Sequence, residues 1–112
     1  MKIYHNPRCS KSRQTLQLIQ EKGAKVEIVE YLKNLPTEGE LKEIIDQLGI
    51  KPAQLIRKGE ADFKENFKGK DLSDSEWIKA MTQFPKLIER PIVVKDNKAV
   101  LGRPPENVLE LL

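Results

Sequence analysis

The residues best suited to chemistry gather near the start of the chain, in the stretch His5-Asn6-Pro7-Arg8-Cys9-Ser10-Lys11-Ser12-Arg13. This stretch holds the only cysteine and the only histidine of the chain, together with three cationic side chains. A helix is predicted to begin just after Cys9, and the unpaired N–H groups of a first helical turn favour a thiolate over a thiol. The neighbouring cations act in the same direction. We therefore predict a nucleophilic thiolate in a loop that attracts anions.

Three neighbours are candidates for activating this thiol. Arg8 would stabilise the thiolate by its charge, His5 would tune or hold it through the imidazole, and Ser12 would donate a hydrogen bond to the sulfur. Two of them have a purely structural alternative, because His5 could simply end a strand and Ser12 could be an ordinary residue of the first helical turn.

The spacing around Cys9 excludes three established thiol patterns. A thioredoxin-type pair would need a second cysteine at position 12, where the chain has Ser12. A low-molecular-weight phosphatase loop would need arginine at position 15, where the chain has Thr15. A cysteine protease would need a histidine far downstream, and there is none. What remains is a single redox thiol that takes its second electron pair from another molecule.

The composition narrows the class of protein further. The chain has 112 residues, a net charge of +3 and a mean hydropathy of −0.55, which predicts one globular domain over residues 1–112. This excess of positive charge is smaller than the dense stripe of basic side chains expected of a DNA-binding protein. A structural zinc site needs about four Cys or His ligands, and the chain has only one of each residue. The lone thiol and the absence of a long apolar run predict a location in the reducing cytoplasm.

Hydrophobic periodicity predicts an α/β chain. A strand over residues 2–5, a helix over 10–21 and a strand over 25–31 form a βαβ unit. A strand pair over 91–95 and 98–101, joined by Asp96-Asn97, precedes a last helix.

The segment between these two units is predicted to be helical. The capping boxes Thr37/Glu40 and Ser73/Glu76 begin two helices, and Pro52 begins a third. Residues 58–70 show only a weak pattern and are predicted to be a mobile loop, with a helical turn within it as an open alternative.

Four separated motifs then resemble one known family, the glutaredoxin-coupled arsenate reductases. They are Tyr4-His5-Asn6-Pro7-Arg8-Cys9-Ser10-Lys11-Ser12-Arg13, Leu55-Ile56-Arg57-Lys58, Arg90-Pro91-Ile92-Val93-Val94 and Gly102-Arg103-Pro104. The resemblance covers nearly the whole chain. It implies a thioredoxin-like fold, with a mixed four-stranded sheet and a helical insertion at about 37–84. It also suggests a cis peptide bond before Pro91.

The resemblance implies a function as well. Cys9 would attack arsenate, glutathione would act as co-substrate, glutaredoxin would complete the reduction to arsenite, and no cofactor would be bound. The oxyanion-binding arginines of the family fall on Arg57, Arg90 and Arg103, and its thiol-activating histidine falls on His5. Guanidinium groups suit this task because their rigid forks match an oxyanion and offset its repulsion of a thiolate. We expect a monomer that contacts neither nucleic acid nor membrane.

Two other functions fit the same sequence. Some thioredoxin-like relatives of these reductases regulate RNA polymerase, but the sensors among them usually carry a cysteine pair, which Ser12 breaks. The second alternative is a glutathione-linked thiol reductase whose substrate contains no arsenic.

Overall fold

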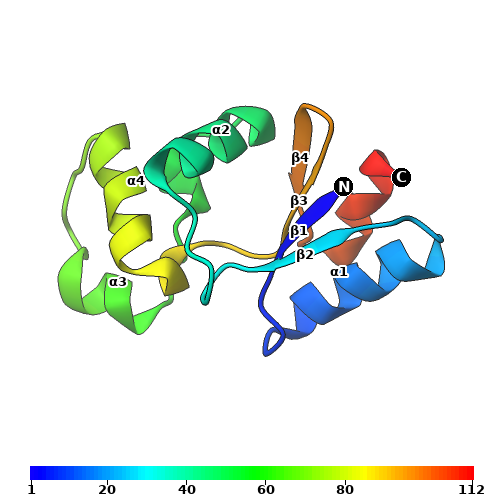
Figure 1. Cartoon of the computed structure of the whole chain (residues 1–112). Coiled ribbons are helices and arrows are strands. Elements are labelled where there is room, and N and C mark those ends of the chain that lie inside the picture. Colours follow the sequence, from blue (N-terminus) through cyan, green and yellow to red (C-terminus); the bar gives the residue numbers. More distant parts are fainter. The chain divides into compact units, whose positions relative to one another are not determined.

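The computed structural model describes all 112 residues and divides into two compact units (Figure 1). The first unit combines Met1–Asn34 with Arg90–Leu112, and the second is Leu35–Glu89. The second unit includes the segment predicted as a helical insertion. That the two units act as one domain over residues 1–112 stays a prediction.

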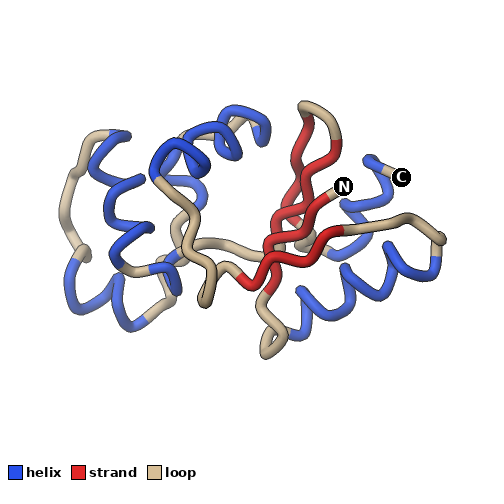
Figure 2. Tube along the Cα trace, viewed as in Figure 1, coloured by secondary structure: helices blue, strands red, loops and turns tan.

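The first unit is built around a mixed sheet of four strands in the order β2-β1-β3-β4 (red in Figure 2). The elements are β1 (Lys2–His5), α1 (Ser10–Glu21), β2 (Glu27–Glu30), β3 (Ile92–Lys95), β4 (Lys98–Leu101) and the 3₁₀ helix η3 (Pro105–Leu111). Strand β1 pairs in parallel with β2 and antiparallel with β3, and β3 pairs antiparallel with β4. This arrangement is thioredoxin-like, as the sequence predicted.

A small apolar core holds the first unit together. It consists of Ile3, Ile19, Val93, Val108 and Leu111, contributed by β1, α1, β3 and η3. Helix α1 packs against η3, so the first and last helices of the chain lie next to each other (blue and red in Figure 1). Burial of these side chains fixes α1, and with it the residue that begins the helix, against the sheet.

Two elements of this unit differ from the sequence prediction. Strand β2 is shorter than the predicted range 25–31, because it is an edge strand and β1 offers it only the four partners Lys2–His5. The last helix is a 3₁₀ helix rather than an α-helix.

The second unit is entirely helical. It contains α2 (Glu38–Leu48), η1 (Pro52–Leu55), α3 (Ala61–Asn66), α4 (Asp74–Gln83) and η2 (Pro85–Leu87). Both predicted capping boxes are present, with the backbone N–H groups of Glu40 and Glu76 donating to Thr37 and Ser73. None of these helices, nor α1, is long and apolar enough to cross a membrane.

Residues 58–70, predicted as a loop, carry the short helix α3. Its periodicity is too brief to stand out in the sequence, and aromatic contacts with another helix stabilise it instead. The rings of Phe63 and Phe67 lie 6.2 and 6.0 Å from that of Trp77 on α4. Such pairs contribute roughly 0.5–1.5 kcal/mol each beyond the area they bury.

Candidate active site

Three loops of the first unit converge at one edge of its sheet. Strands β1 and β4 both run antiparallel to β3, with Tyr4 opposite Ile92 and Ile92 opposite Leu101. The chain therefore leaves β1, enters β3 and leaves β4 at the same edge. Cys9, Arg90 and Arg103 follow or precede these strand ends, and the pairing brings them together although they are far apart in the sequence.

Cys9 is the residue that begins helix α1. Its extended backbone (φ −92°, ψ 123°) is typical of an N-cap, and its N–H donates to the carbonyl of Asn6 at 3.0 Å. The Oδ1 atom of Asn6 accepts a second hydrogen bond from the N–H of Arg8, also at 3.0 Å. Asn6 thus closes the loop that presents the half-buried thiol.

The surroundings of Cys9 lower its pKa below the ordinary value of a thiol. Partial burial is the largest influence and opposes ionisation, but the N–H of Ser12, the Arg90 guanidinium and the N–H of Lys11 together outweigh it. The Cys9 side chain accepts no capping hydrogen bond, and the N–H groups of Ser12 and Lys11 lower its pKa from the first turn of α1. The direction of this shift agrees with the predicted thiolate at the positive end of a helix, and the role of Cys9 as a nucleophile stays a prediction.

Two of the three predicted arginines lie at this thiol. The Nη1 atom of Arg103 lies 3.9 Å from Cys9 Sγ and donates to the carbonyl of Arg90 at 3.2 Å. Of these two arginines, Arg90 is the one that contributes to lowering the Cys9 pKa. The Nε atom of Arg90 is buried and has no hydrogen-bond partner. The peptide bond between Arg90 and Pro91 is cis, as suggested, and so is that between Arg103 and Pro104.

Ser12 reaches the thiol through its backbone and not through its hydroxyl. The hydroxyl oxygen accepts a hydrogen bond from the N–H of Asn6 at 3.0 Å and lies 2.6 Å from Nδ1 of His5. The prediction that the Ser12 hydroxyl donates to the sulfur is therefore wrong. The buried hydroxyl is paired instead with His5, the last residue of β1, and with the N–H of Asn6, which follows it. Either Oγ of Ser12 or Nδ1 of His5 can be the donor in this pair, according to the tautomer of the imidazole.

His5 is buried, and burial is the main cause that lowers its pKa; Glu30 partly offsets this lowering, while Arg13 adds to it. No hydrogen bond joins His5 directly to Cys9. Its contact is with Ser12, whose N–H faces the thiol. His5 is therefore placed to hold the first turn of α1, and its predicted role in activating the thiol stays a prediction.

Arg8 does not play its predicted part in lowering the Cys9 pKa. Its side chain is exposed, and it is not among the groups that stabilise the thiolate. Solvent screens an exposed charge, which explains why a neighbour in the sequence has so little effect. Arg13 instead steadies the loop, since its Nη1 donates to the carbonyl of Pro7 at 2.9 Å.

Arg57 belongs to the helical unit. Its N–H donates to the carbonyl of Leu87 at 2.7 Å, and its guanidinium pairs with the carboxylate of Glu60 at 3.3 Å. Its assignment to oxyanion binding stays a prediction of the sequence.

Thr15 and Gly102 are two residues of this region whose importance the sequence did not indicate. The buried hydroxyl of Thr15 donates to the carbonyl of Gly102 at 3.2 Å, across 87 positions of sequence. A Cβ atom at Gly102 would collide with the Thr15 side chain and lie 2.8 Å from Cγ of Pro91. The only available signal was a threonine four residues before Ile19, on the face that α1 buries.

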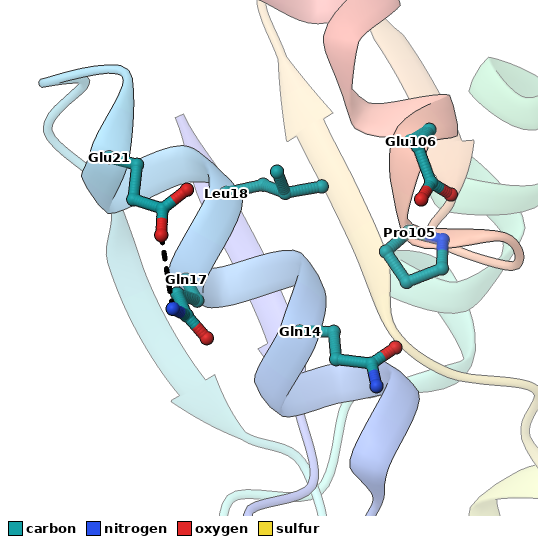
Figure 3. Close-up of a pocket in the computed structure, with 6 residues that line it drawn as sticks. All are labelled: Gln14, Gln17, Leu18, Glu21, Pro105 and Glu106. Atoms are coloured by element: carbon teal, nitrogen blue, oxygen red, sulfur yellow. Dashed lines mark hydrogen bonds between the residues drawn. The ribbon is translucent and has the colours of Figure 1, made fainter.

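A separate pocket of about 260 Å³ lies between α1 and η3 (Figure 3). It is lined by Gln14, Gln17, Leu18, Glu21, Pro105 and Glu106, and none of the predicted site residues is among them. No group of three or more His, Cys, Asp or Glu side chains is arranged as metal ligands.

The fold and this site define a thioredoxin-like protein with one activated cysteine. The chain belongs to the ArsC family, whose model matches residues 4–111. It is 48% identical to the uncharacterized protein YfgD of Escherichia coli, covering 100% of this chain and 96% of that protein. It is 46% identical to an arsenate reductase of Haemophilus influenzae, covering 98% and 97% of the two chains. The solved structure of an arsenate reductase from Vibrio cholerae superposes with a TM-score of 0.94 at 46% identity, covering 100% and 98%.

Proposed function

We propose that this protein reduces arsenate to arsenite. The observation that carries the proposal is the pairing of an activated thiolate, Cys9, with the guanidinium groups of Arg90 and Arg103. Arsenate at neutral pH is a tetrahedral anion, and a thiolate that approaches it is repelled. Guanidinium groups offset this repulsion, and one well-placed donor contributes about 3 kcal/mol to such a transition state.

The buried Nε of Arg90 offers a hydrogen-bond donor to an arriving oxyanion. A buried N–H without a partner is costly, and an oxyanion oxygen would satisfy it. We also assign Arg57 to oxyanion binding, on a different ground: it lies in a motif that resembles one of the arsenate reductases.

The electron balance requires a second thiol. Cys9 sulfur forms a bond to As(V) and one arsenate oxygen leaves as water. Reduction to As(III) then takes two electrons, which two thiols supply when they join in a disulfide. Since Cys9 is the only cysteine of the chain, the other thiols must come from other molecules. We propose that glutathione is this co-substrate and that its sulfur displaces a second arsenic oxygen as water. A glutaredoxin thiolate then attacks the glutathione sulfur, so that a glutaredoxin–glutathione disulfide forms and the arsenic, still bound to Cys9, becomes As(III). Water releases arsenite and restores the Cys9 thiol, and we propose that the reaction takes place in the cytoplasm.

A coupled assay tests the proposal. The protein, NADPH, glutathione reductase, glutathione and glutaredoxin are combined, and NADPH consumption is followed with arsenate and, as a control, with phosphate. We expect consumption that depends on arsenate and is lost in Cys9→Ser. Full turnover by Cys9→Ser would overturn the mechanism.

Two further arms distinguish the competing functions. Replacement of glutaredoxin and glutathione by thioredoxin and its reductase should abolish turnover; activity with thioredoxin alone would overturn the assignment of the electron donor but not of the substrate. Turnover of a glutathione mixed disulfide in the absence of any arsenate turnover would instead identify a thiol reductase.

A further inference from the structure

We infer that Thr15 is a positioning residue that places the Arg103 guanidinium beside the Cys9 thiolate. This assignment rests on the proposed role of Arg103 in oxyanion binding. The Thr15 hydroxyl donates to the carbonyl of Gly102, the residue that precedes Arg103 in the chain, and this backbone is the route by which Thr15 acts.

The contacts of Gly102 show how this coupling works. Its N–H donates to the carbonyl of Pro91 at 2.9 Å, and its carbonyl accepts from the hydroxyl of Thr15 at 3.2 Å. Both polar groups of Gly102 are therefore paired, one with the loop that enters β3 and one with helix α1. The missing side chain allows this close approach, since a Cβ would lie 2.9 Å from the methyl group of Thr15.

Thr15 is fixed at the other end by the helix that presents the thiol. Its hydroxyl also donates to the carbonyl of Lys11 at 2.8 Å, so one proton is shared between two acceptors. Lys11 belongs to the first turn of α1, directly after Cys9 and Ser10. One buried hydroxyl thus ties that first turn to the backbone next to Arg103.

The consequence reaches the reactive atoms. Arg103 is exposed, and its long side chain would otherwise sample many rotamers. The anchored backbone of Gly102 restricts the position of the Arg103 Cα and therefore the range of positions open to the Arg103 guanidinium. This guanidinium lies 3.9 Å from Cys9 Sγ. Removal of the Thr15 hydroxyl should loosen this placement without altering the groups that lower the Cys9 pKa, namely Arg90 and the N–H groups of Ser12 and Lys11.

The test compares alkylation of Cys9 by anionic iodoacetate and by neutral iodoacetamide. Both reagents react with the same thiolate, so the ratio of their rate constants cancels the ionised fraction and reports the local positive charge. We expect Arg103→Gln to lower this ratio about threefold and Thr15→Val to lower it about twofold, as fits one exposed charge. Thr15→Ser keeps the hydroxyl and should retain the wild-type ratio.

A double-mutant cycle identifies the route. If Thr15 acts through Arg103, Thr15→Val should lower the ratio no further in the Arg103→Gln protein. Gly102→Ala displaces the same backbone from the other side and should behave like Thr15→Val, which provides a second variant if the first folds poorly. The matched control is Thr82→Val, because the Thr82 hydroxyl donates only within its own helix, to the carbonyl of Lys79 at 2.7 Å.

A wild-type ratio of rate constants in both Thr15→Val and Gly102→Ala would overturn the inference. So would a Thr15→Val substitution that lowers the ratio by the same factor in the wild-type and in the Arg103→Gln protein. These measurements require no arsenate. A wild-type protein that fails to turn over arsenate would therefore count against the proposed function alone.

Discussion

The Nη1 atom of Arg103 lies 3.9 Å from the sulfur of Cys9, although 94 positions separate the two residues in the sequence. The approach follows from strand order, since β1 and β4 flank β3 and end at the same edge of the sheet. A second arginine, Arg90, precedes β3 at that edge and lowers the pKa of the same thiol. The reactivity of Cys9 is thus a property of three loops and not of its local sequence alone.

The contribution of Arg90 can be separated from that of nearer cations. Arg90→Gln should raise the pKa of Cys9, because it removes a hydrogen bond and a positive charge from the thiolate. Arg8→Gln should leave it unchanged, since Arg8 is exposed. The pH dependence of iodoacetamide alkylation measures both. A wild-type midpoint at or above that of free cysteine, about 8.5, would contradict the activation of Cys9.

Ser12→Ala should destabilise the protein while sparing the reactivity of Cys9. The substitution leaves the buried N–H of Asn6 and Nδ1 of His5 without their partner, which costs about 1–3 kcal/mol in the free energy of unfolding. The backbone N–H of Ser12 stays in place, so the alkylation midpoint should not move. Ser10→Ala, on the exposed side of the same turn, is the control for urea denaturation. A large rise in the alkylation midpoint of Ser12→Ala would contradict this prediction and show that the hydroxyl acts directly on the sulfur.

Acid should destabilise the protein through His5. Its pKa in the folded protein lies below the ordinary 6.5, so the unfolded chain binds more protons at intermediate pH. The contribution of neutral His5 to stability is therefore complete above pH 6.5 and is lost as the pH falls through the folded pKa. His5→Asn, which still offers a polar atom near the Nδ1 position, should show a weaker loss of stability on acidification. Identical pH dependence of the melting temperature in both proteins would contradict this assignment.

Gly102→Ala should be destabilised by about 1–3 kcal/mol, because its new methyl group meets Thr15 and Pro91 and the packed backbone must shift. Gly59→Ala is the matched control. Nothing lies within 4 Å of a Cβ at Gly59, so the free energy of unfolding should stay the same or rise slightly. Equal stability of the two variants in chemical denaturation would show that the space around Gly102 is not restrictive.

Arg57→Ala tests the one oxyanion-binding assignment that rests on sequence alone. We expect kcat/KM for arsenate to fall about a hundredfold, which corresponds to about 3 kcal/mol for the loss of one well-placed donor. Its ion pair with Glu60 is half-buried, and its loss should lower the free energy of unfolding by about 1 kcal/mol or less. Lys58→Ala removes the adjacent positive charge and should keep kcat/KM near the wild-type value. Equal activity of both variants in the coupled assay would remove Arg57 from the site.

Much of the fold was predictable because its signals are local. The capping boxes at Thr37 and Ser73 begin helices α2 and α4 as predicted, and the strands around Asp96-Asn97 form the predicted hairpin. Helix α3 was missed because its stability comes from aromatic contacts with Trp77, which lies on another helix. Neighbours in space, which a short window of sequence does not contain, decided that segment.

The sequence by itself determined the candidate nucleophile, since Cys9 is the only cysteine and precedes a predicted helix. The motifs around Arg90 and Arg103 marked the positive charges that were predicted to act with it. Only the tertiary structure decided which neighbours act on the sulfur. It directed the Ser12 hydroxyl toward His5, left Arg8 in solvent and brought the buried hydroxyl of Thr15 against Gly102. The physical reason is that the direction of a side chain depends on burial and on hydrogen-bond partners, and these are set by strand pairing between distant parts of the chain.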